Sequence, residues 1–434
     1  MRVFIGSLRP VFLLGLFGVL FLAPAAAETV AVRGATVHTL GPSGTLENAT
    51  LVIENGVLRA VGLDLEVPSG ARVIDATGKV VTPGLIDSVS RLGLIEISLE
   101  SSTVDSATED PRWTAAFEVV DAVNPASALI AANRVEGLTR AVVAPQARSG
   151  PVAGLGAAIH LGSAADPVVL SPAAMFAVYG EEGARRAGGS RAAALARLRE
   201  LFEDARDFGD HGEAFARGER REYSASRKDL EALQPVIAGE LPFAVYAHRA
   251  SDIRAMLRLG TEFDLRLVLI GATEAWKVAP ELAAAGVPVV LNPFDNLPAS
   301  FERLGATVEA ASRLHAAGVT IAFYTGDAHN ARNLRQGAGN AVAYGLPWEV
   351  ALAAMTSAPA EIWGLADSWG TLEPGMEADL VVWDGDPLEV TSFPEHIFIR
   401  GEEISLENRQ TRLRDRYRDL EDDTLPVYRV NPSP

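Results

Sequence analysis

From about residue 83 to residue 369, the chain alternates short apolar runs with stretches of helical period. The strand-like runs include 139–145, 243–249, 266–272, 288–293 and 319–327. The stretches between them, such as 190–208 and 304–318, place apolar residues on one helical face. Buried strands that alternate with helices predict a parallel sheet. About 280 residues of this pattern favour a (β/α)8 barrel over an open sheet.

Both flanks of this region contain shorter strands of another kind. Residues 29–80 alternate apolar and polar side chains, and Asn55-Gly56 between two such runs is a strong hairpin signal. Similar strands return after residue 370. We therefore predict a small composite β-sandwich domain from residues 28–82 and 370–405. The barrel is predicted to span 83–369, and a C-terminal helix and tail to span 406–434.

The first 27 residues have the pattern of a secretory signal peptide. Arg2 and Arg9 precede an apolar run of 13 residues, Val11 to Ala23, and a cleavage site of the A-x-A type follows. An uncleaved anchor is the alternative, but a membrane span needs about 20 apolar residues. We predict cleavage after Ala27 and export to the periplasm or the medium, with no membrane attachment afterwards.

The charge and the lack of cysteine exclude several classes of protein. The chain has a formal net charge of −18 and no Cys. An acidic chain of this kind is a poor partner for nucleic acid or an anionic membrane. Without Cys there are no disulfides, thiolate metal ligands or cysteine nucleophiles. The partners that remain are a small-molecule substrate or ligand, a second copy of the chain, or a paralogue.

Two motifs resemble the amidohydrolase superfamily. "VTPGLID" (81–87) follows the N-terminal strands, and "TSAPAEIWGLADSWGTLEPGMEADLVVWDGDP" (356–387) precedes the last ones. The resemblance extends over nearly the whole chain after residue 27, and the imidazolonepropionase-like and dihydroorotase-like branches look most similar. It implies a (β/α)8 barrel, a composite β-sandwich and metal-assisted hydrolysis of C–N bonds.

Most of the metal ligands that the resemblance implies are replaced in this sequence. The two histidine positions of the first barrel strand fall on Val89 and Arg91, and a later one falls on Gly271. No lysine lies between Lys79 and Lys228 to bridge two metals. Valine cannot coordinate a metal, and arginine carries a permanent positive charge. A tightly bound two-metal cluster is therefore not expected.

Two of the implied site residues are present: His248, and Asp327 in "FYTGDAHN". The resemblance implies that Asp327 acts as metal ligand and general base, and His248 as ligand or polarising group. Since a catalytic zinc takes about three protein ligands, these two would hold at most one Zn-like divalent ion weakly. His329 or His160 is a candidate third ligand.

Arginines at the carboxyl ends of the predicted strands suggest an electrostatic role. Arg91 is expected to lie near Asp327, where its charge would replace part of the metal's or bind a substrate carboxylate. Arg249, His329 and Arg332 complete the predicted substrate-binding set. The loop after residue 291 lies on the same face, and its Asn292, Asp295 and Asn296 are candidate pocket residues.

These features predict a hydrolase that acts on the C–N bond of an amide or cyclic amide, with water attacking the carbonyl carbon. The alternative is a catalytically silent homologue that binds a ligand or serves as a scaffold for an active paralogue. A metal-independent isomerase or lyase on the same barrel is a third hypothesis, since one fold supports many reactions.

Overall fold

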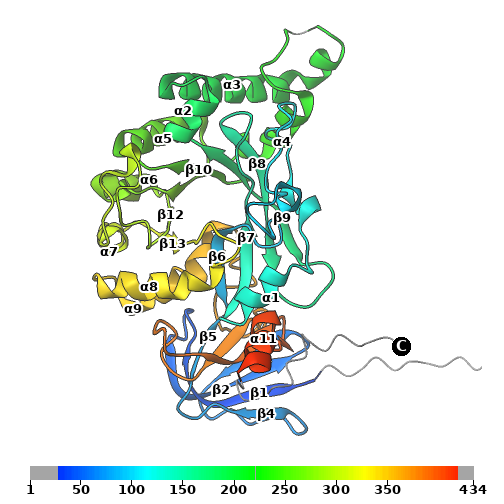
Figure 1. Ribbon diagram of the computed structural model, residues 1–434, viewed down its shortest axis with the longest axis vertical. Helices are drawn as coiled ribbons and strands as arrows, with labels where there is room; N and C mark the ends of the chain where they lie inside the picture. The colour runs from blue at the N-terminus through cyan, green and yellow to red at the C-terminus, as the bar shows by residue number, and fades with distance from the viewer. Residues whose placement is uncertain (1–27, 220, 419–434) are drawn as a thin grey trace, which may run out of the picture.

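The computed structural model describes residues 28–219 and 221–418, which form two eight-stranded sheets (Figure 1). The predicted signal peptide at 1–27 and the predicted tail from 419 onward lie outside the described residues. One sheet curls into a nearly closed barrel, and the other is built from both ends of the chain. The predicted barrel with an additional composite β-sheet is confirmed.

The barrel sheet follows the chain in order from β6 to β13. Its strands are β6 (Leu85–Ser90), β7 (Leu138–Val143), β8 (Val152–His160), β9 (Val168–Val178), β10 (Phe243–Ala247), β11 (Leu267–Gly271), β12 (Val289–Leu291) and β13 (Ile321–Phe323). At the seam between the first and last strands, the N–H of Gly326 donates to the carbonyl of Val89 at 3.0 Å. This contact brings the ends of β6 and β13 to the same side of the barrel.

Strand β8 departs from the predicted repeat because it runs antiparallel to both of its neighbours, β7 and β9. The connections before and after it cover only residues 144–151 and 161–167. A parallel crossover needs about a dozen residues, so connections this short must return the chain antiparallel. The fold thus keeps an eight-stranded barrel although two of its connections are too short for a crossover helix.

Side chains along the barrel strands alternate between the interior and the surrounding helices, as the pleat requires. In β10, Ala244 and Tyr246 belong to the inner cluster, whereas Phe243, Val245 and Ala247 pack outward. The same period places the next even residue, His248, at the inner rim beyond the end of β10. The strand pattern therefore determines which side chains reach the barrel mouth.

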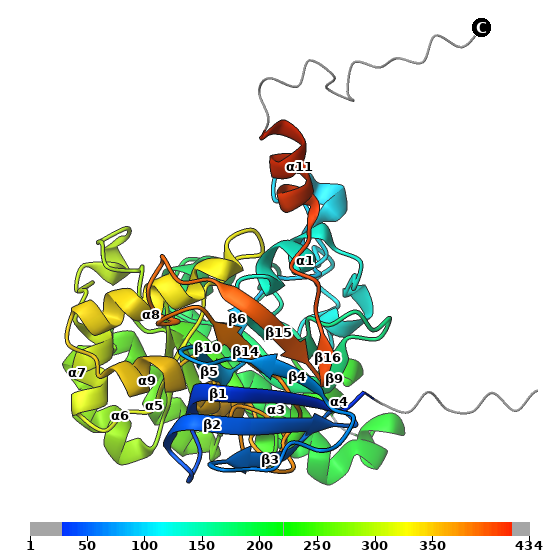
Figure 2. The ribbon, with the colours of Figure 1, turned by 90° about the horizontal axis from the view of Figure 1, so that it is seen from below.

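Helices cover the outside of the barrel (Figure 1). They are α1 (Ala128–Arg134), α2 (Glu181–Arg186), α3 (Arg191–Ala216), α4 (Arg227–Ile237), α5 (Ala250–Phe263), α6 (Ala279–Ala285), α7 (Ala310–Ala316), α8 (Leu334–Ala343), α9 (Trp348–Ala353) and α10 (Ser357–Ile362). Helix α11 (Arg409–Tyr417) lies apart from this layer and extends away from the body of the molecule in Figure 2. In the described residues, no helix combines the length and apolar character needed to cross a membrane.

The second sheet joins the two chain ends (Figure 2). Its strands are β1 (Val30–His38), β2 (Thr45–Glu54), β3 (Val57–Gly62), β4 (Arg72–Asp75), β5 (Val80–Pro83), β14 (Leu380–Trp383), β15 (Pro394–Ile399) and β16 (Glu402–Glu403). Strands β5 and β14 are antiparallel neighbours, with Val81 opposite Val382. The predicted hairpin is confirmed, because Asn55 and Gly56 both have positive φ between β2 and β3.

Candidate functional site

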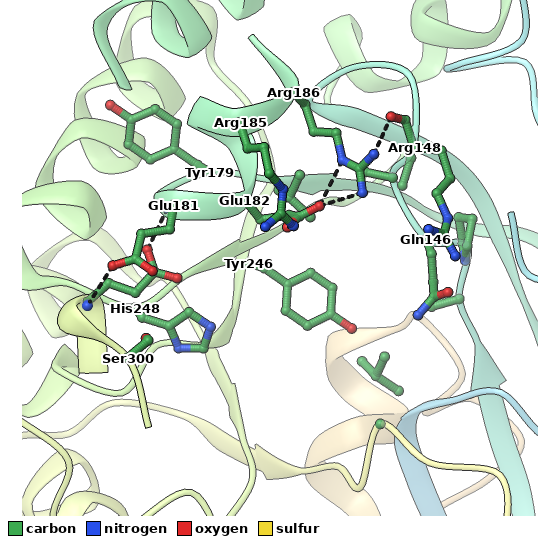
Figure 3. A pocket seen from close by; sticks show the side chains of 18 of the residues that line it. Gln146, Arg148, Tyr179, Glu181, Glu182, Arg185, Arg186, Tyr246, His248 and Ser300 are labelled. Carbon is green, nitrogen blue, oxygen red and sulfur yellow. Dashed lines mark hydrogen bonds and ion pairs between the residues drawn. The ribbon is translucent and has the colours of Figure 1, made fainter. Parts of the chain in front are cut away.

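A cavity of about 550 Å³ opens at the carboxyl ends of the parallel barrel strands. We call it the mouth pocket. Its walls come from the residues that follow β6, β7, β9 and β10, from the loop after β12, and from helix α2. Figure 3 shows the ring of Tyr246 between His248 and Gln146. Catalytic and binding groups of barrel enzymes lie at this end of the barrel.

His248 is buried in the wall of the mouth pocket and is held from both sides. Its Nδ1 lies 2.9 Å from the hydroxyl of Thr273, and its Nε2 lies 3.1 Å from a guanidinium nitrogen of Arg303. Arginine can only donate, so Nε2 accepts and Nδ1 carries the proton. Burial, assisted by the charge of Arg303, lowers the pKa of His248 to about 3. The imidazole is therefore neutral at physiological pH.

Arg303 belongs to the loop after β12, which two carboxylates fix in place. The side chain of Glu302 accepts from the N–H of Glu181 at 2.6 Å, and that of Glu181 accepts from the N–H of Glu302 at 3.1 Å. Arg191 also donates to Glu302. This pair of reciprocal bonds, the Glu181–Glu302 clasp, anchors the loop to the start of α2. Arg303 itself pairs with Asp295 at 3.2 Å.

Arg91 lines the mouth pocket immediately after β6. With the Gln146 amide turned so that its oxygen faces the guanidinium, that oxygen lies 2.6–3.2 Å from all three nitrogens of Arg91. In the described part of the chain, no carboxylate forms an ion pair with Arg91. Nearby, burial raises the pKa of Tyr246 to about 12, and the charge of Arg91 opposes that rise.

Asp327 is occupied by its own loop. Its Oδ1 accepts from the N–H groups of Ala328 and His329 at 2.6 and 2.9 Å, and its Oδ2 accepts from the Asn330 amide at 3.3 Å. Burial acts to raise the pKa of Asp327, but these hydrogen bonds outweigh it and the pKa lies below its usual value. The expected proximity to Arg91 is not realised as an ion pair among the described residues, because backbone donors satisfy the carboxylate.

A second carboxylate lies beneath the pocket. Asp87 is fully buried and accepts from the N–H and the hydroxyl of Thr325 at 3.0 and 2.5 Å. Burial raises the pKa of Asp87 to about 7, against the effect of those hydrogen bonds. Asp87 thus links β6 to the segment after β13 and supports the barrel seam.

The other predicted site residues lie outside the walls of the mouth pocket. Arg249 donates to Asp252 at 2.8 Å, which provides that buried carboxylate with a partner. The Nδ1 of His329 is 3.9 Å from Asp327. The N–H of Arg332 donates to Asn133. His160 bonds to the carbonyl of Asp166 and to the N–H of Gly162, and it lines a different cavity beside the second sheet.

The donor set of the mouth pocket does not fit a divalent metal ion. In the regions that the structure describes, no group of three or more His, Asp or Glu side chains is placed to hold one. Val89 and Arg91 line the pocket, and the guanidinium of Arg303 lies against Nε2 of His248. A cation at this nitrogen would meet a fixed positive charge instead of a lone pair.

Several pocket residues were not predicted from the sequence. They include Tyr246, Gln146, Ser300 and, above all, Arg303. The loop after β12 was identified as a pocket segment, and its Asp295 does contact Arg303. The period of β10, which places Tyr246 on the same face as His248, was an available signal for Tyr246. No local pattern marks Arg303, because its position depends on the clasp to α2.

Comparisons with known proteins agree with this architecture. The sequence matches the amidohydrolase family over residues 201–409. It is 26% identical over 394 residues to the amidohydrolase tasK of Hapsidospora irregularis, an alignment that covers 81% of this chain but 39% of that protein. The chain therefore spans about two fifths of the length of this fungal relative.

A solved structure gives a fuller match. The amidohydrolase of Thermotoga maritima MSB8 superimposes with a TM-score of 0.78 at 30% sequence identity, covering 87% of this chain and 99% of that one. A short region is 40% identical to the imidazolonepropionase of Klebsiella pneumoniae (strain 342) over 76 residues, which is 16% of this chain and 18% of that protein.

Proposed function

Because this chain belongs to the amidohydrolase family, we propose that it is a hydrolase that cleaves a C–N bond of an amide or cyclic amide in the mouth pocket. The observation that carries the proposal is the presence of His248, Arg91 and Arg303 around one cavity at the catalytic end of the barrel. The family usually uses divalent metals, but this donor set does not fit one, so the mechanism rests on side chains.

In this mechanism, guanidinium groups stabilise the charge that develops on the carbonyl oxygen. Water attacks the carbonyl carbon, and a tetrahedral oxyanion forms within reach of the Arg303 donors. Fixed donors aimed at such an oxyanion are commonly the largest catalytic contribution. The neutral imidazole of His248 holds the Arg303 nitrogen at 3.1 Å. The C–N bond then breaks, and the nitrogen leaves with a proton.

Asp327 is the proposed acceptor of the proton from the attacking water. It adjoins Gly326, which lines the mouth pocket, and its lowered pKa keeps it ionised at neutral pH. Its hydrogen bonds to the loop make it a weak base, so slow turnover is expected. The predicted roles of Arg249, His329 and Arg332 in substrate binding belong to the outer rim in this scheme and remain predictions.

Release of amine from a panel of small amides and cyclic amides tests the proposal. The wild type is expected to release amine, and Asp327→Asn to lower the rate by at least tenfold while the melting temperature stays within a few degrees. Metal analysis of the same preparation is expected to find less than one ion per chain. Activity that requires two stoichiometric divalent ions would contradict the side-chain mechanism.

A catalytically silent, ligand-binding homologue is the second candidate, and two observations favour it. Nε2 of His248 is covered by Arg303, and Oδ1 of Asp327 is held by two backbone N–H groups. A silent homologue would gain thermal stability from a ligand without releasing amine. The absence of amine release across the panel, together with such stabilisation, would favour this candidate over the hydrolase.

We also propose export, on the basis of the sequence pattern in residues 1–27. The expected mature N-terminus is Glu28. N-terminal sequencing of the protein from a periplasmic or culture fraction checks this cleavage, and an intact N-terminus at Met1 would contradict it. A homo-oligomer or a paralogue partner is likewise a proposal, which light scattering on the purified protein tests.

A further inference from the structure

Arg91 differs from the other arginines of the mouth pocket in its ion pairing. Five arginines line the cavity. Arg185 and Arg186 pair with Glu182, Arg303 with Asp295, and Arg148 lies 3.7 Å from Glu109. Arg91 has no carboxylate partner among the described residues. A partly buried guanidinium without a counter-ion is a strong donor for an anion that enters the cavity.

The contact with Gln146 leaves the edges of the Arg91 guanidinium available. A guanidinium is planar, and an oxygen in its plane can approach at most two of its three nitrogens. The Gln146 oxygen lies within 3.2 Å of all three, so it is placed over the face of the group. The in-plane N–H donors, whose geometry matches a carboxylate, therefore point toward other partners.

The charge of the cavity is opposite to that of the protein. The five lining arginines exceed the three lining glutamates, Glu181, Glu182 and Glu302. The whole chain carries a net charge of −18. A positive cleft enclosed by low-dielectric walls concentrates anions and guides them inward. The cavity is thus the place where this acidic protein attracts a negatively charged ligand.

A second unsatisfied polar group lies at the other side of the cavity. The hydroxyl of Ser300 is buried and has no hydrogen-bond partner within the part of the chain that the structure describes. Figure 3 places Ser300 beside His248, with Tyr246 between this side and Gln146. Buried polar atoms usually have a partner, so a lone hydroxyl in a pocket wall marks a position for a ligand atom. It lies in the same wall as Arg303.

We propose that the mouth pocket takes a small acidic substrate, a carboxylate-bearing amide. Its carboxylate binds in the plane of the Arg91 guanidinium, and the oxygen of its amide group meets Ser300 and Arg303. This inference rests on the proposed function only in treating the mouth pocket as the substrate site. It names the chemical class of the substrate, and Arg91 and Ser300 determine the specificity.

Calorimetry with glutarate and with its neutral counterpart glutaramide tests the inference on the full-length protein without requiring turnover. Glutarate is expected to bind at least tenfold more tightly than glutaramide at pH 7. Arg91→Gln is expected to abolish this preference. Arg91→Lys, which keeps the charge but loses the fork, should reduce it several-fold. The matched control is Arg416→Gln, which removes the same charge from the exposed helix α11 and should change nothing.

The outcomes separate this inference from the proposed hydrolase. A preference for glutarate that depends on Arg91 supports the acidic ligand class even if no amide is hydrolysed. Equal binding of the two probes, or a preference that survives both Arg91 substitutions, overturns the inference. If neutral amides are nevertheless hydrolysed, the proposed function stands and only the substrate class is wrong. Since Arg91→Lys retains the cation, it keeps the test interpretable if Arg91→Gln does not fold.

Discussion

At the scale of single residues, the ring of His248 and the backbone of Gly271 compete for one space. A Cβ at Gly271 would lie 2.4 Å from Cε1 of His248. Gly271 also has a φ of +75°, a conformation that glycine adopts without strain. The position where related sequences carry a metal-binding histidine is therefore filled here by the imidazole of the neighbouring strand. Restoring that ligand would require His248 to move.

Gly271→Ala is expected to lower the free energy of unfolding by about 1–3 kcal/mol more than Gly364→Ala, because only the first substitution overpacks a buried ring. Gly364 is a matched control, since it has the same φ of +75° and a Cβ there would meet no described atom within 4 Å. Urea denaturation of both variants measures the difference. Equal losses of stability would show that His248 does not occupy the space beside Gly271.

Asp87 gives a prediction for the pH dependence of stability. Its pKa is about 7 in the folded protein, against an ordinary value of 3.8. The folded state therefore holds an extra proton between these values, and the stability from this group is full below pH 3.8 and is lost as the pH rises toward 7. Asp87→Asn removes that loss. The stability of the variant relative to wild type should rise by about 1.4 kcal/mol per pH unit in this window.

His248 acts in the opposite direction, which is why the difference between variant and wild type is the informative quantity. Its pKa falls from 6.5 to about 3 on folding, so the unfolded chain binds the extra proton and stability is lost as the pH falls from 6.5 toward 3. The two slopes oppose one another in the wild type. Denaturation curves for Asp87→Asn that run parallel to those of the wild type from pH 4 to 7 would contradict the burial argument.

At the scale of elements, the loop after β12 carries exposed apolar residues but is fixed at one point. Leu297, Phe301 and Leu304 are exposed, whereas Glu302 between them is buried in the Glu181–Glu302 clasp. The loop delivers Arg303 and Ser300 to the mouth pocket. The geometry of the pocket therefore depends on one carboxylate that contacts no substrate.

Glu302→Ala should release this loop, because the N–H of Glu181 and the guanidinium of Arg191 lose their acceptor. Chymotrypsin is expected to cut after Leu297 or Phe301 at least several-fold faster than in the wild type. Glu309→Ala is the control, since the Glu309 carboxylate is exposed and pairs with Arg313, one turn further along the same helix. Unchanged cleavage of the Glu302 variant would show that other contacts hold the loop.

The elements also show what the sequence could predict. The Asn55-Gly56 hairpin and the buried barrel strands follow from local chemistry, and both were predicted. The antiparallel course of β8 was missed, although the short connections around it contain the reason. In the site, Arg91 and His248 could be assigned to the pocket from their places in the strands. The loss of Asp327 to its own loop and the arrival of Arg303 depend on loop conformations that no periodicity encodes.

At the scale of the whole molecule, Arg140 joins the barrel to the second sheet. Its side chain is 1% exposed and forms ion pairs of 2.5 Å with Glu377 and Asp379, which precede β14. It also lies over the ring of Trp369, 3.6 Å from the centroid. One buried cation of β7 thus serves two carboxylates from a distant part of the chain.

Arg140→Met is expected to lower the free energy of unfolding by about 3–5 kcal/mol, because it leaves buried Asp379 without its counter-ion. Arg254→Met is the matched control. Arg254 pairs with Glu281 on the surface, where such pairs contribute at most about 1 kcal/mol. Urea denaturation measures both. A loss below about 1 kcal/mol for Arg140→Met would show that the junction does not depend on this ion pair.

The pairing of Val81 with Val382 has a consequence for the synthesis of the protein. Translation proceeds from the N-terminus, so β1 to β5 leave the ribosome some 300 residues before their partner β14 exists. The first sheet therefore cannot be completed during most of the chain's synthesis, whereas the barrel strands between them find neighbours in the order in which they emerge. Assembly of the junction between the two sheets is the closing event of folding, and a nascent chain halted before residue 380 lacks it.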